Sequence, residues 1–385
     1  FEIPPMLKLG LLLPHSNVYP ALSMNFVDGL HLAIDQLPPE QRPEVILEDI
    51  GHGGNKDLII EKAQKMLLQY RVAGILGFVN HYPIEALTQI ANTHRKPFLI
   101  SDLGGSLMPP SDSPFMSFNT GGVWESAYHA GQLLGKAKRK MAVIGAFYDG
   151  GFHYPIGFHQ GLTQNGGSVV YNLFQGDQPA EGQWDKLPSK LKESEADALF
   201  VQLSGNDAKT FFEWLDTHPL PDDIEIWTNP FAVAAAHAES WSAQVPEGIQ
   251  SVCTWSPELE HAANTAFITD YKEFYGAAPD FLSVIGFENG LIIKHLIEEK
   301  ILNARPPRGL PAAPITIESP RGGLHFNPEQ QHWETNHYLR TSAAHPQGPS
   351  SNPVSSTLPE LENITTLRSN SQNRPVTGWY STYLC

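Results

Sequence analysis

The chain has 385 residues, of which 41% are hydrophobic and 17% are charged, and it carries a formal net charge of −16 at pH 7. This length allows two or three packed domains, and the apolar share is too high for a disordered chain. The acidic balance disfavours nucleic acid and anionic membrane surfaces as partners, because both bind clustered lysine and arginine. No stretch reaches the about eighteen consecutive apolar residues that a membrane span needs, so we expect no membrane insertion of this chain.

The start of the chain and its two cysteines leave several readings open. The numbering begins at Phe1 without a charged and apolar leader, and this start is compatible with the earlier removal of a targeting segment. Cys253 and Cys385 could form a disulfide in an oxidising compartment or remain separate thiols. Two cysteines are too few for a zinc site of the four-cysteine type.

Short apolar runs alternate with amphipathic stretches through the first hundred residues, which predicts a parallel sheet covered by helices. The expected strands are residues 7–13, 45–50, 72–79 and 97–100, and the expected helices are residues 23–37, 58–70 and 83–93.

A second series of the same kind follows a turn-rich loop at residues 109–111. Its expected strands are residues 115–118, 141–147, 168–174, 198–203, 224–228 and 248–254, and helices lie between them. Two more helices, 262–275 and 281–301, precede short extended pieces near Ile315, Leu324 and Tyr338. From Ala343 the composition predicts an extended tail without its own core, and its aromatic end, Trp379 to Leu384, predicts docking on a domain surface.

Several short motifs occur in an order that resembles one family, the type I periplasmic binding proteins of the leucine/isoleucine/valine-binding class, which are substrate-binding proteins of ABC transporters. The resemblance spans about residues 6–340. It is carried by residues 9–14 followed by 26–34, by 74–77 followed by 96–101, and by 271–276 with Pro279 and 286–287.

The resemblance implies an α/β fold of two Rossmann-like lobes, each a mostly parallel sheet flanked by helices, joined by three crossovers. We expect those crossovers near Phe118, near Thr254 and at residues 319–326. The first lobe would comprise residues 1–118 and 255–320, the second 119–254 and 321–342, and a C-terminal extension 343–385 would follow. The ligand would lie in the cleft between the lobes, since the ligand crevice of an open α/β sheet lies outside the carboxyl ends of its strands.

The resemblance also implies ligand-binding residues at the positions that match the family's binding site. In the first lobe, Asn80, His81 and Tyr82 stand where the family presents a helix N-terminus to a ligand carboxylate. The next loop completes that contact with Leu103, Gly104 and Gly105. In the second lobe, Tyr148, Asn206, Asn229 and Phe231 fall where the family supplies an aromatic lid and a partner for the ligand amine.

Two departures from the family pattern change the expected ligand. Residues 228–231 contain no carboxylate, and residues 80–82 contain no serine or threonine, so the usual contacts to an α-amino acid are missing. We therefore expect weak or no binding of leucine, isoleucine and valine. The aromatic candidates suit an apolar or aromatic solute with a few polar contacts; they are Tyr19, Tyr82, Tyr148, Phe231 and Phe287. Core packing is the alternative for Tyr82 and for Phe287.

Motifs of common enzyme sites, among them the G-x-S-x-G elbow, the phosphate-binding G-x-x-x-x-G-K-[ST] loop and H-E-x-x-H, do not occur in the sequence. His325, His332 and His337 could suggest a metal cluster, but spacings of seven and five residues favour solvated strand histidines. We expect no catalytic residue, cofactor or metal.

These features together predict an exported solute-binding protein of the periplasm or cell envelope. Such a protein would capture an amino acid or another small solute by hinge closure and deliver it, as a monomer, to the permease of an ABC importer. A sensory receptor module of the same fold is the main alternative, and a two-domain α/β enzyme is a third.

Overall fold

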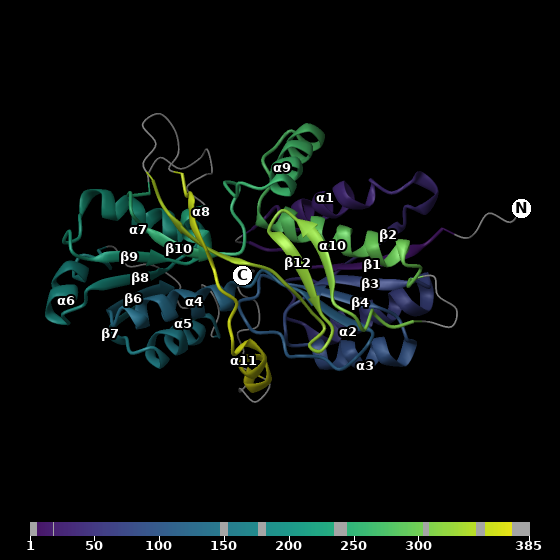
Figure 1. Cartoon of the computed structure of the whole chain (residues 1–385), viewed down its shortest axis with the longest axis horizontal. Helices are drawn as coiled ribbons and strands as arrows, with labels where there is room; N and C mark the ends of the chain where they lie inside the picture. The colour runs from purple at the N-terminus through teal and green to yellow at the C-terminus, as the bar shows by residue number, and fades with distance from the viewer. Residues whose placement is uncertain are drawn as a thin grey trace, which may run out of the picture. The chain divides into compact units, whose positions relative to one another are not determined.

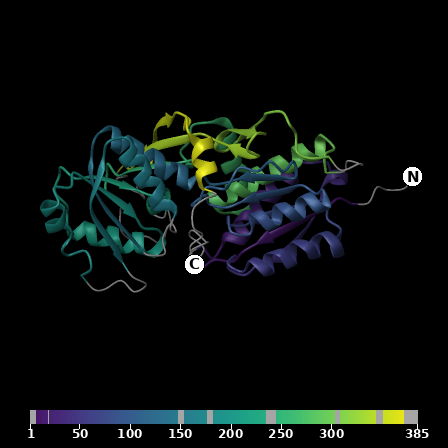
Figure 2. The same ribbon diagram turned by 90° about the horizontal axis from the view of Figure 1, so that it is seen from below.

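The computed structural model describes residues 6–17, 19–146, 153–175, 182–234, 245–302, 308–343 and 351–371, which form two compact units (Figure 1). Unit 1 contains Phe1–Gly121, Glu260–Thr335 and Asn363–Cys385, and unit 2 contains Gly122–Leu259 and Asn336–Glu362. Each unit has its own sheet, with helices on both faces (Figures 1 and 2). No helix of the described part is long and apolar enough to cross a membrane.

The sheet of unit 1 has eight strands in the described residues, in the order β11-β12-β13-β5-β4-β3-β1-β2. Strands β1 to β5 are mutually parallel where they pair, and the β11–β12 hairpin continues into β13, which is parallel to β5. The strands are β1 (Lys8–Leu13), β2 (Glu44–Asp49), β3 (Gly74–Phe78), β4 (Phe98–Ser101), β5 (Met116–Asn119), β11 (Ile315–Ser319), β12 (Gly322–Asn327) and β13 (His332–Glu334). The helices are α1 (Leu22–Ile34), η1 (Pro39–Gln41), α2 (Lys56–Lys65) with its continuation η2 (Met66–Tyr70), α3 (Ile84–His94), α9 (Ala262–Tyr275), α10 (Phe281–Glu298) and α11 (Ile364–Ser371).

The sheet of unit 2 has seven strands in the described residues, in the order β15-β14-β10-β9-β8-β6-β7. Its central strands are parallel, and β14 and β15 add an antiparallel edge. The strands are β6 (Lys140–Ala146), β7 (Ser168–Gln175), β8 (Ala198–Gln202), β9 (Glu225–Thr228), β10 (Gln250–Cys253), β14 (His337–Thr341) and β15 (Val354–Leu358). The helices are α4 (Val123–Lys136), α5 (His153–Gln164), α6 (Leu187–Glu193), α7 (Gly205–Thr217) and α8 (Pro230–Ala234).

Helices α1 and α10 pack against each other so closely that only glycine fits at the contact. A Cβ atom at Gly286 would lie 2.0 Å from the carbonyl oxygen of Phe26, and one at Gly29 would lie 2.0 Å from that of Ser283. Asp280 begins α10 with a capping box, accepting from the Ser283 amide at 2.8 Å, and its other oxygen accepts from Asn25 of α1 at 2.7 Å. The glycines and this cap together fix α10 against α1.

The expected fold class, with two mostly parallel sheets and flanking helices, is confirmed. The chain passes from one unit to the other at four places in the described residues, after Gly121, Leu259, Thr335 and Glu362. The first three passages correspond to the expected crossovers, but the third lies later than residues 319–326. The fourth lies in the C-terminal extension.

Two assignments near the C-terminus need correction. Residues 321–342 do not all join the second lobe, because β12 pairs with β11 and β13 pairs with β5 in the first sheet, and only β14 joins the second. The extension is not merely an extended tail, since it forms β15 on the edge of the second sheet and then α11 in unit 1. Its aromatic end lies outside the described residues.

The close approach of α1 and α10 leads to the first prediction. Gly286→Ala should lower the free energy of unfolding by about 1–3 kcal/mol, because the new methyl group meets a backbone carbonyl that cannot turn aside. Gly54→Ala is the matched control, since a Cβ there has no atom within 4 Å and the change should cost less than about 0.5 kcal/mol. Urea denaturation measures both, and equal stabilities of the two variants would contradict this account of the helix contact.

Candidate ligand-binding site

The carboxyl ends of the parallel strands in unit 1 bring most of the candidates of that unit to one edge of the sheet. Tyr19 lies in the loop after β1, Asn80 to Tyr82 follow β3, and Leu103 to Gly105 follow β4. Strands β1, β3 and β4 are neighbours in the sheet, so these three loops are adjacent. This edge is where an open α/β sheet binds ligands.

Asn80 is buried and connects the loop after β3 to the loop after β2. Its Nδ2 donates to the Gly53 carbonyl at 2.8 Å, which ties the loop after β3 to the loop after β2. Its Oδ1 accepts from the Tyr82 amide at 3.0 Å, which closes a turn. Asn80 therefore sets the position of its neighbours His81 and Tyr82, whose side chains are half-buried.

Tyr82 carries a cation over its ring. Lys56 Nζ lies 5.4 Å from the ring centroid, within the range of a cation–π contact. On the same edge, His15 and His52 are hydrogen-bonded through their Nε2 atoms at 3.2 Å, and Asp49 Oδ1 lies 3.6 Å from His15 Nδ1. The edge thus offers aromatic and imidazole rings with a lysine beside them.

The loop after β4 is built around Asp102. Its Oδ1 accepts from the Gly104 amide at 2.8 Å, and its carbonyl accepts from the Gly121 amide at 2.9 Å. Gly104 has a φ of 75°, a conformation that glycine adopts without strain. Leu103 is buried, so its side chain belongs to the core while the backbone of Gly104 and Gly105 forms the turn.

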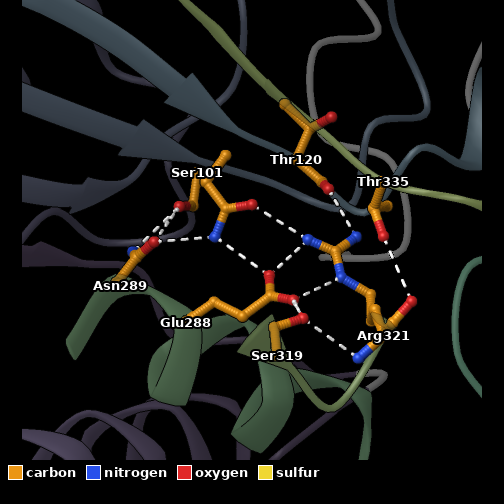
Figure 3. Close-up of polar contacts among 8 residues, drawn as sticks. Ser101, Thr120, Glu288, Asn289, Ser319, Arg321 and Thr335 are labelled. Atoms are coloured by element: carbon orange, nitrogen blue, oxygen red, sulfur yellow. Dashed lines mark hydrogen bonds and ion pairs between the residues drawn. The ribbon is translucent and has the colours of Figure 1, made fainter. Parts of the chain in front are cut away.

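A fully buried ion pair lies beneath this edge (Figure 3). The side chains of Arg321 and Glu288 are both 0% exposed. Arg321 Nε donates to Glu288 Oε1 at 2.8 Å, and Nη2 donates to Glu288 Oε2. Ser319 Oγ also donates to Glu288 Oε1, at 2.7 Å. Each charge is thus met by an opposite charge and by further hydrogen bonds, as a buried pair requires.

The pair extends into a polar network that reaches three strand ends. Arg321 Nη2 donates to Asn119 Oδ1 and Nη1 to the Thr120 carbonyl, both at 2.9 Å. Asn119 Nδ2 donates to Asn289 Oδ1 at 3.0 Å, and Asn289 Nδ2 donates to Ser101 Oγ at 2.9 Å. The network therefore joins α10 to the residues that end β4 and β5 and to the turn after β11 (Figure 3).

The sequence interpretation missed this network, although it carries a signal. Glu288 and Asn289 interrupt an otherwise apolar and glycine-containing run in the helix, residues 284–293. Buried acidic and amide groups on such a helix need partners. The sequence alone does not show that the partner of Glu288 is Arg321.

In unit 2, Asn229 repeats the arrangement of Asn80. It is fully buried after β9, its Nδ2 donates to the Leu203 carbonyl at 2.7 Å, and its Oδ1 accepts from the Phe231 amide at 2.8 Å. Phe231 is buried beside it, whereas Asn206 is exposed in the first turn of α7. Tyr148 lies outside the described residues.

Phe287 does not follow a strand end but lies on α10. Its ring packs against Phe267 of α9 at 4.8 Å between centroids. This contact is core packing, the alternative that the helical stripe with Val284 also predicts.

The model of the family described as periplasmic binding protein matches residues 6–336. The chain belongs to this family of solute-binding proteins. The expected resemblance is thereby confirmed.

Solved structures of similar fold agree with this membership. The periplasmic binding protein described here is 20% identical to a solute-binding protein of an ABC transporter from Rhodopseudomonas palustris BisB5, in complex with 3,4-dihydroxybenzoic acid, with a TM-score of 0.69 over 92% of this chain and 97% of that one. It is 21% identical to an ABC transporter substrate-binding protein from Sphaerobacter thermophilus, with a TM-score of 0.73 over 92% and 98%. It is also 21% identical to a solute-binding protein from R. palustris in complex with benzoate, with a TM-score of 0.67 over 94% and 99%. No curated protein matches the sequence.

Of the three histidines considered as a metal cluster, His332 differs from the expectation of solvent exposure. His332 is buried, with its ring 4.9 Å from that of Phe118 and its Nε2 3.3 Å from the Pro109 carbonyl, so the expectation of a solvated histidine is wrong for this residue. Burial lowers its pKa well below the usual value. Among the described residues, no group of three or more His, Cys, Asp or Glu could hold a metal ion.

Cys253, at the end of β10, is a buried free thiol, and its burial raises its pKa. Cys385 lies outside the described residues, so the two alternatives for these cysteines, a disulfide or separate thiols, both stay open.

The buried ion pair leads to the second prediction. Glu288→Ala should lower the free energy of unfolding by about 3–5 kcal/mol, because it leaves the Arg321 guanidinium buried without a counter-charge. Glu193→Ala is the control, since its pair with Lys190 is 61% and 40% exposed and the change should cost less than about 1 kcal/mol. Urea unfolding measures both, and a loss below 1 kcal/mol for Glu288→Ala would show that the pair does not constrain unit 1.

Proposed function

We propose that this periplasmic binding protein captures a small aromatic or partly apolar carboxylate and delivers it to the permease of an ABC importer. The site would bind without a cofactor and without catalysing a reaction, and the protein would act as an exported monomer. Family membership supports the capture of a solute. The complexes of two similar proteins with 3,4-dihydroxybenzoic acid and with benzoate support the chemical class.

The observation that carries the proposal is the role of Asn229. This residue stands in the turn where the resemblance implies a carboxylate for a ligand amine, yet it is neutral and fully buried. Its Nδ2 and Oδ1 hydrogen-bond the backbone at Leu203, Phe231 and Ala232. A ligand ammonium group would therefore find no counter-charge in this turn, which disfavours α-amino acids.

The edge of unit 1 offers complementary chemistry. Tyr82 can stack on an aromatic ring, and Lys56 beside it supplies a positive charge for an anionic substituent. The turn at Gly104 and Gly105 adds backbone groups without side-chain bulk. These features together favour a planar, anionic solute over an aliphatic zwitterion.

The third prediction tests the ligand class directly. Isothermal titration calorimetry on the purified chain should give binding of benzoate or 4-hydroxybenzoate with a Kd at least about a hundredfold below that of leucine, a difference of roughly 3 kcal/mol. Mass spectrometry of any solute that co-purifies with the protein provides an independent readout. Tight leucine binding with no response to either benzoate would overturn the proposed ligand class.

The fourth prediction concerns Tyr82. Tyr82→Ala should weaken 4-hydroxybenzoate binding about tenfold, because an aromatic contact contributes roughly 0.5–1.5 kcal/mol beyond its buried area. Tyr70→Ala is a matched control, because Lys65 Nζ lies 5.2 Å from the Tyr70 ring centroid, nearly the same geometry as at Tyr82, but Tyr70 ends η2 and does not follow a strand. Equal affinities for the two variants would remove Tyr82 from the site.

Tyr148→Ala applies the same titration to the aromatic candidate of unit 2. An unchanged affinity with unchanged thermal stability would remove Tyr148 from the site.

A further inference from the structure

Two histidines that follow neighbouring strands of unit 1 bring their imidazole rings together. His15 follows β1 and His52 follows β2, and these two strands pair in parallel, with Leu13 opposite Asp49. The Nε2 atoms of the two rings lie 3.2 Å apart, and the ring planes meet at 68°. Both side chains are exposed, so the paired nitrogens belong to a surface that a dissolved ion can reach.

The backbone fixes the separation of the two rings. The His15 amide donates to the Gly51 carbonyl at 2.9 Å, which ties the loop after β1 to the residue before His52. The Gly53 amide, on the other side of His52, donates to the Ile50 carbonyl at 3.2 Å and closes a turn. The two imidazoles are therefore carried by loops that are already bonded to each other.

A carboxylate lies behind one of the rings. Asp49 Oδ1 is 3.6 Å from His15 Nδ1, and the same oxygen accepts from the Gly51 amide at 2.6 Å. A carboxylate at Nδ1 favours the tautomer that is protonated there, which leaves the lone pair on Nε2. Histidines that bind metal ions commonly have such a carboxylate at their second nitrogen. The surroundings of His15 thus match those of a metal ligand.

The distance between the two nitrogens fits a shared metal ion. Zn²⁺ binds imidazole nitrogens at about 2.0–2.1 Å in tetrahedral geometry, which places two such nitrogens about 3.3–3.4 Å apart. The separation of 3.2 Å between the two Nε2 atoms is close to this value. Neutral imidazole is a good ligand for Zn²⁺, Cu²⁺ and Ni²⁺. The formal net charge of −16 also favours a divalent cation as the partner of an exposed site.

The pair is smaller than a structural metal site. Among the described residues, no group of three or more His, Cys, Asp or Glu could hold a metal ion, so the pair would share its ion with water or with another small ligand. A tetrahedral ion that is bound by two protein nitrogens has two further positions for such ligands.

We infer that His15 and His52 form a two-histidine chelate for a first-row divalent metal ion, with Zn²⁺ as the ion that fits their spacing. Each histidine supplies its Nε2 nitrogen, Asp49 orients the His15 ring, and water completes the coordination. This inference goes beyond the proposed function, because that function needs no metal and neither histidine is among its ligand-binding candidates.

Titration of Zn²⁺ into the purified chain, without an affinity tag, tests the chelate by calorimetry. His15→Ala and His52→Ala should each weaken the strongest Zn²⁺ binding at least about tenfold, or about 1.4 kcal/mol, because each removes one of two ligands. The double variant should bind no more weakly than either single variant, since one substitution already abolishes the chelate.

His325→Ala is the matched control. His325 is an exposed histidine of β12 in the same unit, but its Nδ1 lies 3.0 Å from Thr316 Oγ1 instead of a second imidazole. This variant should keep the native affinity for Zn²⁺. Thermal unfolding without metal checks that all variants are folded, which is expected because the replaced side chains are exposed.

The inference is overturned if the native chain does not bind Zn²⁺, if either single variant keeps the native affinity, or if His325→Ala loses as much. The contact between His15 and His52 would then be a hydrogen bond only. Losses that add up in the double variant would also overturn it, because they indicate two separate histidine sites. No benzoate is present in these titrations, so their failure is distinguishable from failure of the proposed ligand class.

Discussion

The buried pair of Arg321 and Glu288 is the constraint on which unit 1 depends. Two charges without exposure to water are tolerated only while each remains paired and hydrogen-bonded, so every element that touches the pair must keep its place. Arg321 donates to the carbonyl of Thr120, just before the chain leaves unit 1 after Gly121, and its own carbonyl accepts from Thr335, the last residue before the next departure. Because removing one partner alone would leave a buried, uncompensated charge, the pair holds the elements around it in one arrangement. Here that arrangement includes two of the segments through which the units are connected.

The same network supports the edge of the sheet where the ligand candidates lie. Ser101 is bonded to Asn289 and immediately precedes Asp102, whose side chain and carbonyl hold the glycine turn and Gly121. A disturbance at Glu288 would therefore reach this turn through two hydrogen-bonded residues. Such a support can hold a binding site in its working geometry although none of the network's charged side chains lies at the ligand. The edge itself is formed mainly by backbone, aromatic and imidazole groups.

The regular part of the fold was predictable from the sequence, and the reason is periodicity. Strands such as β1, β3 and β6 are continuous apolar runs, and helices such as α1 and α4 carry apolar residues at helical spacing, so their positions follow from local pattern. The three-residue strand β13 and the polar strand β15 lack such a pattern. β13 pairs with β5, whose residues lie far away in the chain, and β15 adds a largely exposed edge beside β14. The pairing of Glu288 with Arg321 was not predicted either, because the two residues are 33 positions apart and local sequence does not distinguish either from a surface charge.

Two of the predicted ligand groups, Asn80 and Asn229, hydrogen-bond the backbone of their own and neighbouring loops. Asn80 and Asn229 were both predicted as ligand groups, and both follow a parallel strand. Yet each uses its Oδ1 to accept the amide two residues later and its Nδ2 to donate to a neighbouring loop, at Gly53 and at Leu203. Each unit thus has a buried asparagine after a parallel strand, and the side-chain amide of that asparagine hydrogen-bonds the backbone and fixes the conformation of the loop. The side chains that follow in these turns, Tyr82 in unit 1 and Phe231 in unit 2, are both aromatic, and it is these side chains that we propose contact the solute.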